Sequence, residues 1–344
     1  MGSYHAVSAP LGILNFSFYK LPHQGKNYVD RYLVVPKSLK LLLKPRLLYI
    51  AYFCKRREVR RRVMDYAWQV EQLIALALQE DLGSGDVATE ALIASSQVAT
   101  ARWYAKATGV VSGLGVALRV FQTLDPAIEM QVRIAEGQSV TVGQEIVSFQ
   151  GNFKALLIGE RTALNFAQRM SGIATSTRAF VDAIGNLPTR LLDTRKTAPG
   201  HRLLDKQAVR DGGGTNHRMG LYDLAMIKDN HIVAAGGIRQ AVEQVRKSMP
   251  AYLRIEVETS CMKEVQEALE AKTDIIMLDN MPLEAMREAV KLIDGRAFTE
   301  ASGNVTRERV RAIAETGVDF VSTGAITHSV QALDISMKLE VHNV

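Results

Sequence analysis

The chain has 344 residues, enough for one large domain or two of ordinary size. Its 47% hydrophobic and 23% charged content is typical of a soluble globular protein with a substantial core. The two cysteines, Cys54 and Cys261, lie far apart, which excludes a disulfide scaffold and a cysteine-rich zinc site and indicates a reducing compartment. We therefore expect a cytoplasmic location.

The net charge of +6 is concentrated near the N-terminus. Residues 1–64 hold 13 of the 42 Lys and Arg residues but only 2 of the 36 Asp and Glu residues. The other 280 residues consequently carry 29 basic and 34 acidic side chains. The pI near 9.2 is therefore no argument that the body of the chain binds nucleic acid, and we expect neither a nucleic-acid nor a membrane partner.

Residues 1–66 are predicted to form a basic N-terminal extension. They carry no signal-peptide cleavage pattern, and no apolar run reaches the roughly 18–20 residues of a membrane span. Arginine clusters at Arg56-Arg57 and Arg60-Arg61-Arg62 are accompanied by few acids. Three interpretations stay open: a poorly ordered extension or start-site artefact, a targeting or surface-binding arm, and an added structural element.

Globular sequence begins near Ala67 and first predicts a small α+β region. Apolar residues recur at helical spacing from Val70 to Leu78, and Gly83 suits the end of that helix. Short strands are predicted at 101–107, 131–135 and 145–149, separated by glycines. Residues 156–183 predict a helix that breaks near Gly172.

From Leu191 the pattern changes to alternating strands and helices. Strands are predicted at 191–193, 225–227, 253–257, 274–278, 297–300 and 320–322. Glu258, Asp279 and Glu300 each follow or end a strand and are spaced 21 residues apart, which indicates a repeated βα unit. Such repeats give a parallel sheet that can curl into a barrel, with chemistry at the carboxyl ends of the strands. Because only six strands are predicted, an incomplete or open barrel is expected.

Basic side chains gather at several of these strand ends and loops. They lie in the segments 192–197 (LDTRKT), 212–218 (GGGTNHR) and 227–231 (IKDNH). Cations among glycines and short apolar runs suit a ligand with several negative charges, and a guanidinium pairs best with a planar carboxylate. A Schiff-base role for Lys228 is the weaker alternative, because nothing beside it indicates carbonyl chemistry.

The acids and the small-residue loops allow more than one interpretation. Glu258 and Asp279 could act as a general acid/base pair or as ion-pair partners of the basic group. The loops 302–304 (SGN) and 323–325 (TGA) could be ordinary tight turns. Two such loops on the last barrel strands favour phosphate binding by backbone N–H groups and helix N-termini. No His-x-x-x-His pair predicts zinc.

Over residues 70–340 the chain resembles the quinolinate phosphoribosyltransferases. The resemblance is carried by the basic segments above together with the motifs EDLGSGD (80–86), ERTALN (160–165), SGIAT (171–175), EVE (256–258), LDN (278–280), EASGN (300–304) and STGAITHS (322–329). It implies an α/β protein in which an open, incomplete parallel α/β barrel is preceded by a smaller α/β sandwich domain. We accordingly predict a sandwich domain at 67–175, a barrel domain at 176–328 and a C-terminal helix at 329–344.

The resemblance also implies a reaction and partners. Quinolinate and phosphoribosyl pyrophosphate would give nicotinate mononucleotide, pyrophosphate and carbon dioxide in NAD synthesis, with Mg²⁺ and a homodimer, or an oligomer of dimers, whose sites are shared. A related transferase acting on another aromatic acid, or a binding protein without catalysis, are the alternatives. The retention of so many cations argues against a monocarboxylate substrate.

Individual roles carry over by position from the resemblance. Quinolinate contacts fall on Arg161 of the neighbouring subunit and on Arg195, His217, Arg218 and Lys228. Contacts to phosphoribosyl pyrophosphate fall on Lys196, Glu258, Asp279, Ser302, Gly303, Asn304, Thr323, Gly324 and His328. Lys196, Glu258 and Asp279 are the implied catalytic residues, and Glu258 and Asp279 the implied metal ligands. Two features depart from the family pattern: His201 and the run Asp205-Lys206-Gln207.

Overall fold

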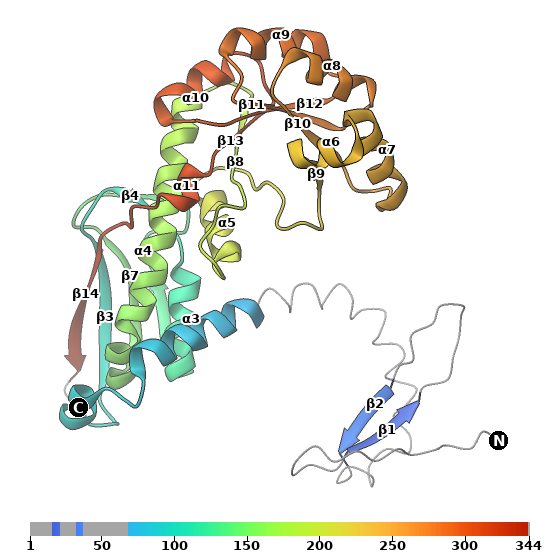
Figure 1. Cartoon of the computed structure of the whole chain (residues 1–344). Coiled ribbons are helices and arrows are strands. Elements are labelled where there is room, and N and C mark those ends of the chain that lie inside the picture. The colour runs from blue at the N-terminus through green and yellow to red at the C-terminus, as the bar shows by residue number, and fades with distance from the viewer. Residues whose placement is uncertain (1–15, 21–31, 37–67, 343–344) are drawn as a thin grey trace, which may run out of the picture. The chain divides into compact units, whose positions relative to one another are not determined.

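A computed structural model describes residues 16–20, 32–36 and 68–342. The chain divides into two compact units, Met1–Tyr66 and Ala67–Val344, which are described separately. In the first unit, β1 (Phe16–Lys20) and β2 (Tyr32–Pro36) pair as an antiparallel hairpin (Figure 1). The remaining predictions for residues 1–66 lie outside the described residues.

The second unit contains an antiparallel sheet with helices packed against it. Residues 68–82 are helical and are followed by α2 (Val87–Leu92). The sheet has four strands in the order β14-β3-β7-β5, with β3 at Val98–Ala105, β5 at Glu129–Val132, β7 at Glu145–Asn152 and β14 at Ile335–His342. The pair β4 (Gly109–Val110) and β6 (Ser139–Val140) lies outside it, and α3 spans Leu114–Leu124. The three strands expected in this region are therefore present, with shifted ends.

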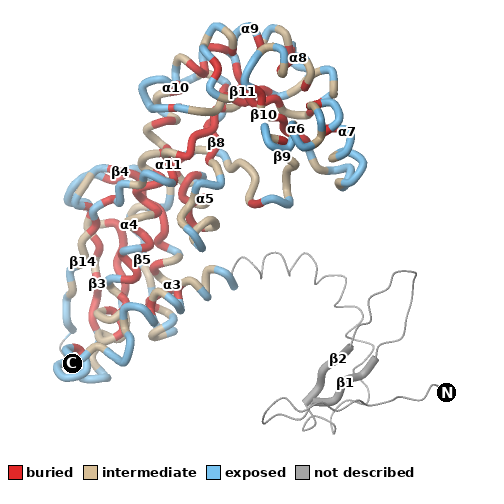
Figure 2. Tube along the Cα trace, viewed as in Figure 1, coloured by how far each residue is buried: buried red, intermediate tan, exposed pale blue. Residues whose placement is uncertain are grey.

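Aromatic side chains form the centre of this part of the core. Trp103 on β3, Phe121 on α3 and Phe149 on β7 are fully buried. The Phe121 and Phe149 ring centroids are 4.7 Å apart, and those of Trp103 and Phe149 are 5.2 Å apart. Edge-on and tilted aromatic contacts of this kind fix helix against sheet through apolar burial. Figure 2 shows the buried trace running through these strands and along the long helix α4.

The C-terminal helix predicted at 329–344 is wrong. Residues Ile335–His342 instead form β14, which pairs antiparallel with β3 from Ile335 opposite Ala105 to His342 opposite Val98. Ile335, Met337, Leu339 and Val341 alternate with polar residues, and a period of two is the strand pattern. The end of the chain thus returns to the sheet that the earlier residues build.

The break predicted near Gly172 is also wrong. The helix α4 (Phe153–Ile184) runs unbroken for 32 residues, about 48 Å at 1.5 Å per residue. Gly172 serves packing instead, because a Cβ there would overlap the carbonyl oxygen of Gln331 and lie 3.0 Å from Cα of Ala332. The predicted domain boundary at 175/176 falls inside this helix.

A parallel sheet of six strands positions the candidate site. Its order is β8-β13-β12-β11-β10-β9. The strands are β8 (Arg190–Leu192), β9 (Ala225–Ile227), β10 (Ile255–Thr259), β11 (Ile275–Asp279), β12 (Phe298–Ser302) and β13 (Phe320–Ser322). All six predicted strands are present, and β8 and β9 are the two edges, so the expected open α/β arrangement is confirmed without a closed barrel.

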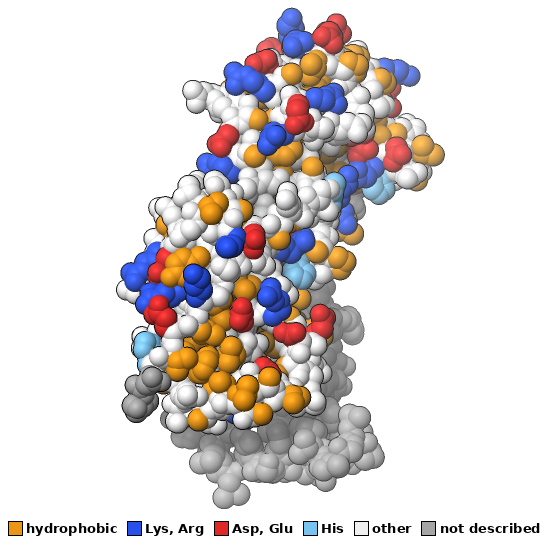
Figure 3. Space-filling view, turned by 90° about the vertical axis from the view of Figure 1, so that its left-hand side faces the viewer, with side chains coloured by type: hydrophobic (Ala, Val, Ile, Leu, Met, Phe, Trp, Pro, Cys, Tyr) orange, Lys and Arg blue, Asp and Glu red, His pale blue; other side chains and the backbone are white. Residues whose placement is uncertain are grey.

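The connections between these strands are helical and cover the sheet. They are α5 (Arg202–Asp211), α6 (Asp229–Ala235), α7 (Ile238–Ser248), α8 (Met262–Glu270), α9 (Leu283–Ile293) and α10 (Arg307–Ala314). The short helix α11 (Ala325–His328) follows the last strand and leads towards β14. No helix in the described part of the chain is long and apolar enough to cross a membrane. On the face shown in Figure 3, basic and acidic side chains are mixed, and hydrophobic side chains gather in the lower half.

Candidate active site at the carboxyl ends of the parallel strands

The parallel strands bring most of the predicted site residues to one edge of the sheet. Neighbouring strands all run the same way, so their carboxyl ends meet there. These ends carry Arg195 and Lys196 after β8, Thr323 and Gly324 after β13, Ser302, Gly303 and Asn304 at and after β12, Asp279 at the end of β11, Glu258 on β10 and Lys228 after β9. A site assembled from six strand ends can surround a ligand of several groups.

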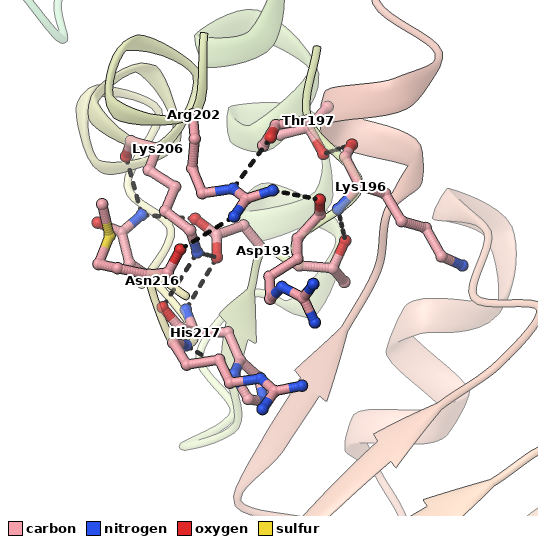
Figure 4. A network of polar contacts seen from close by, with 12 residues as sticks. Asp193, Lys196, Thr197, Arg202, Lys206, Asn216 and His217 are labelled. Carbon is pink, nitrogen blue, oxygen red and sulfur yellow. Dashed lines mark hydrogen bonds and ion pairs between the residues drawn. The ribbon is translucent and has the colours of Figure 1, made fainter. Parts of the chain in front are cut away.

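A buried ion pair anchors the loop that carries His217 and Arg218. The ammonium of Lys206, on α5, contacts the carboxylate of Asp193, and neither side chain is exposed. Asp193 also accepts hydrogen bonds from the Asn216 side chain (2.6 Å) and the backbone N–H of His217 (2.9 Å), while Lys206 donates to the carbonyl of His217 (3.0 Å). Figure 4 shows these residues converging. Burial raises the pKa of Asp193 and lowers that of Lys206, since loss of hydration outweighs their attraction.

The imidazole of His217 faces two buried acids. Its Nε2 lies 3.2 Å from Oε2 of Glu256 on β10 and 3.3 Å from Oε2 of Glu300 on β12. Burial opposes the charged form, but the two carboxylates raise the pKa of His217 to about 10. The backbone N–H of Arg218 lies 2.7 Å from Nδ1 of His217 and disfavours a proton on that nitrogen. The two carboxylates beside Nε2 have the larger effect on the pKa, because they are charged and the N–H is neutral. Burial and the neighbouring Glu300 raise the pKa of Glu256 to about 7.

Two guanidinium groups lie close together beside this triad. Burial and the nearby Arg195 lower the pKa of Arg218. Arg218 donates to the carbonyl of Leu224 (3.1 Å) and contacts the sulfur of Met226, and the Arg195 side chain is exposed. Neither guanidinium forms an ion pair with an acid among the described residues. A pocket of about 430 Å³ opens beside Arg218, Met226 and His231, and the rest of its lining is mostly apolar.

Lys228 and the two predicted metal ligands lie on neighbouring strand ends. The ammonium of Lys228 contacts the carboxylate of Glu258, and both side chains are partly exposed. Asp279 accepts a hydrogen bond from the side chain of Asn280 (2.8 Å). Because β10 pairs with β11, Glu258 and Asp279 offer hard carboxylate oxygens from adjacent strands, which is the donor type that Mg²⁺ prefers. Among the described residues, a different group, His217 with Glu256 and Glu300, is the one whose three ligand atoms come within 4.8 Å of one another.

In each of the two small-residue loops, the backbone of a glycine closely approaches neighbouring side chains. A Cβ on Gly324 would fall 2.7 Å from Cδ of Lys196 and 2.8 Å from Cδ2 of His328, so the three residues meet at one point. Gly303 has a φ of 87°, and a Cβ there would overlap the Asn280 side chain. Glycine is therefore needed at both positions, since a side chain would displace Asn280 or Lys196 from the loops proposed for phosphate binding.

Arg161 is the predicted site residue that does not lie with the others at the carboxyl ends of the parallel strands. It is exposed on α4, and within the described residues it has no hydrogen bond or ion pair. Arg169, about 12 Å further along that helix, pairs through two bonds (3.0 and 2.8 Å) with the buried Asp205 of α5. Arg161 therefore lies two helical turns farther from the helix that supports the site.

The remaining histidines have local roles. Nδ1 of His231 lies 3.1 Å from the backbone N–H of Lys228, which orders the start of α6. His201 precedes α5, and its ring lies 5.8 Å from that of Phe166; burial lowers its pKa. Neither ring nitrogen of His201 meets another predicted site residue in the described structure.

Several supporting residues were not predicted as site residues from the sequence, among them Asp193, Asn216 and Glu300. Lys206 and Asp205 belonged to the run noted as unusual, which was the available signal for them. Glu256 lies inside strand β10, where a charged residue between Ile255 and Val257 breaks the apolar pattern. An acid at a fully buried strand position is rare enough to mark a special role.

Comparisons with known proteins agree with this geometry. The family model described as quinolinate phosphoribosyl transferase, N-terminal domain, matches residues 86–171, and that of the C-terminal domain matches residues 173–338. The chain belongs to the quinolinate phosphoribosyltransferase family. The resemblance inferred from its motifs is thereby confirmed.

Individual members of the family are similar over most of their length. The chain is 51% identical to the probable nicotinate-nucleotide pyrophosphorylase [carboxylating] of Synechocystis, over 76% of this chain and 90% of that protein. It is 48% identical to quinolinate phosphoribosyltransferase [decarboxylating] 1b of Nicotiana tabacum, over 79% and 83%. The crystal structure of NadC from Streptococcus pyogenes superposes with a TM-score of 0.78 at 41% identity, covering 80% of this chain and 98% of that one.

Proposed function

We propose that this chain joins quinolinate to phosphoribosyl pyrophosphate, producing nicotinate mononucleotide, pyrophosphate and carbon dioxide in NAD biosynthesis. The observation that carries the proposal is the pair of guanidinium groups of Arg195 and Arg218, which lie close together and form no direct ion pair with an acid in the described structure. A dicarboxylate is the ligand that such a pair satisfies best, since each planar carboxylate can accept two parallel charged hydrogen bonds. Membership of the family supports the same substrate.

The residues of the site would divide the work between the two substrates. Arg195, Arg218 and Lys228 hold quinolinate so that its ring nitrogen faces the anomeric carbon of the ribose. The nitrogen's electron pair forms the new bond while the carbon–oxygen bond breaks and its electrons leave on pyrophosphate. The reaction needs positioning and fixed charge more than a covalent nucleophile.

Loss of carbon dioxide would follow from the new bond. A quaternary ring nitrogen withdraws electrons from the adjacent ring carbon, so the bond to the neighbouring carboxylate breaks. Its electron pair stays on the ring carbon, which takes up a proton from water. The remaining carboxylate keeps its clamp, and the product is nicotinate mononucleotide.

The phosphate-bearing substrate fits the other half of the sheet edge. Lys196 lies against Gly324 and His328, and the backbone of Gly303 lies against Asn280. We propose that Lys196 and these two loops hold the phosphates, with Ser302, Asn304 and Thr323 lining the same strand ends. Lys196 then carries the positive charge that faces the departing pyrophosphate.

We further propose that Glu258 and Asp279 hold Mg²⁺ and the ribose hydroxyls. Their carboxylate oxygens on adjacent strands fit a hard cation that usually binds one or two carboxylates plus substrate oxygens. When bound, magnesium supplies positive charge that neutralises the pyrophosphate. Lys228 would exchange its contact with Glu258 for one with quinolinate.

A homodimer with shared sites completes the proposal. Arg161 is exposed on α4 and lies away from the residues that gather at the sheet edge, which supports a role in the site of a second copy. The cytoplasmic location expected from the cysteine content stays a prediction.

The test is an assay of the purified full-length chain with quinolinate, phosphoribosyl pyrophosphate and Mg²⁺, following nicotinate mononucleotide and pyrophosphate. We expect equal amounts of both products and one equivalent of carbon dioxide. Nicotinate in place of quinolinate is the control substrate, and we expect it to react poorly because it lacks the second carboxylate. Faster turnover of nicotinate, or no product from quinolinate, would contradict the proposal.

A further inference from the structure

Two buried acids stand beneath the proposed quinolinate site without a role in the reaction described above. Glu256 on β10 and Glu300 on β12 flank the central strand β11, opposite Ile275 and Met277 respectively. Their side chains are 0% and 1% exposed. Burying a carboxylate in a protein interior is costly unless it is paired, so stability alone would favour apolar residues at both positions.

Within the described structure, the imidazole of His217 is the one group that forms an ion-pair contact with both acids. Nε2 of His217 lies 3.2 Å from Glu256 and 3.3 Å from Glu300. Neither oxygen of Glu256 has a well-aligned hydrogen bond, and the same holds for Oε1 of Glu300. The two strands therefore present their carboxylates to His217, and the nearby Arg218 guanidinium also attracts Glu256.

The backbone of His217 is also held by hydrogen bonds. Its backbone N–H donates to Asp193 (2.9 Å) and its carbonyl accepts from Lys206 (3.0 Å). Nδ1 lies 2.7 Å from the backbone N–H of Arg218. Nε2 is thus held by the two acids, and Nδ1 lies against the backbone of Arg218. The ring connects the two acids to the backbone of Arg218, whose guanidinium lies near Arg195.

We propose that Glu256 and Glu300 are positioning residues for quinolinate binding, acting by clamping the Nε2 edge of His217 and thereby fixing the backbone and guanidinium of Arg218. This inference rests on the proposed function of the site. It gives His217 a positioning role in addition to the direct quinolinate contact expected from its position in the family motif, which stays a prediction. It also accounts for two acids that the phosphate and metal subsites leave unused.

The test compares Glu256→Gln and Glu300→Gln with the wild-type chain in steady-state assays in which each substrate is varied. Glutamine keeps the size of the side chain and removes its charge, so the clamp on Nε2 is weakened while packing is retained. We expect the KM for quinolinate to rise about tenfold or more, with kcat and the KM for phosphoribosyl pyrophosphate changed less than about twofold. A loss of binding that is equal in ground and transition states appears in KM alone.

Asp319→Asn is the matched control. Asp319 lies at the opposite end of the same sheet, where it accepts hydrogen bonds from the N–H and hydroxyl of Thr299 (both 2.8 Å). Removal of its charge is expected to lower the melting temperature and to leave both KM values unchanged. If either glutamine variant fails to fold, Glu256→Asp and Glu300→Asp replace them. Aspartate retains the charge on a shorter side chain, and the same selective rise in the KM for quinolinate is expected.

Several outcomes would overturn the inference. Unchanged quinolinate KM in folded variants would show that the acids position nothing, and equal increases in both KM values would show a general structural defect. One equivalent of a transition metal in the purified wild-type chain, absent from both glutamine variants, would make the cluster a metal centre instead. Absence of any nicotinate mononucleotide from the wild-type chain is a separate result, which would reject the proposed function itself.

Discussion

At the scale of single residues, the proposed site separates two kinds of recognition. The planar guanidinium groups of Arg195 and Arg218 lie near one another, whereas the carboxylates of Glu258 and Asp279 lie on β10 and β11. The first kind suits the carboxylates of quinolinate and the second suits magnesium and ribose hydroxyls. Substitutions in the two groups should therefore affect different substrates.

Arg218→Lys is expected to raise the KM for quinolinate ten- to a hundredfold. Lysine keeps the charge but loses the planar fork, and a charged hydrogen bond contributes on the order of 1.5–3 kcal/mol. Asp279→Asn, the companion variant, should instead raise the magnesium and phosphoribosyl pyrophosphate requirements, because it removes an anionic oxygen. Kinetics with each component varied separate the two. The division of the site would be wrong if Arg218→Lys changed only the requirement for phosphoribosyl pyrophosphate.

The stability contributed by His217 should depend on pH in a defined direction. Its pKa rises from 6.5 to about 10 on folding, so the folded state binds the extra proton more tightly. Its contribution to the free energy of unfolding is then fully present below about pH 6.5 and is lost as the pH rises towards 10. Urea unfolding of the wild-type chain and of His217→Asn across this range measures it. We expect the difference between them to shrink as the pH rises, and a constant difference would count against the assignment.

At the scale of elements, α4 connects the antiparallel sheet to the helices around the parallel one. It packs against α3, α5 and α10, and its passage at Gly172 is close to the segment that leads into β14. The glycine is therefore needed for the approach of residues 331–332 and not for a bend. Close packing of this kind makes the helix intolerant of even one added methyl group.

Gly172→Ala is expected to destabilise the protein by about 1–3 kcal/mol, although alanine is the better helix former. The reason is overlap of the new methyl group with the carbonyl of Gln331. Gly115→Ala in α3 is the matched control, because a Cβ there meets nothing within 4 Å. It should stabilise by about 0.4–1 kcal/mol through the unfolded state. Thermal or urea unfolding gives both values, and a neutral Gly172→Ala would show that the 331–332 segment can move away.

At the scale of the whole molecule, the proposed homodimer would complete each site with Arg161 from a second copy. The strand ends gather the other cations, while Arg161 stays exposed on α4. Arg161→Ala and Lys228→Ala should each abolish most activity alone. Mixed and reassembled, they should recover activity, because a hybrid dimer contains one site with neither substitution. Wild-type homodimer treated in the same way is the control, and hybrids that form without any recovery would reject the shared site.

The sequence by itself determined the parallel sheet and the positions of most proposed site residues. Each strand of that sheet is a short apolar run followed by its functional side chain, so the information is local: the strands at 225–227 and 320–322 even have the predicted ends. Parallel connectivity then brings the strand ends to one edge. The order of the strands was therefore enough to predict that the binding residues, from Lys196 to Gly324, lie at that edge.

Only the tertiary structure decided the contacts between residues distant in the chain. The alternation in Ile335–His342 did not show that its partner would be Val98–Ala105, and Gly172 gave no sign of its neighbour at Gln331. Glu256 and Glu300 became interpretable once both were seen to face Nε2 of His217, and Lys206 once it met Asp193. Burial and pairing of charges depend on which strands enclose them, and that is fixed by packing of the whole chain, not by the residues on either side.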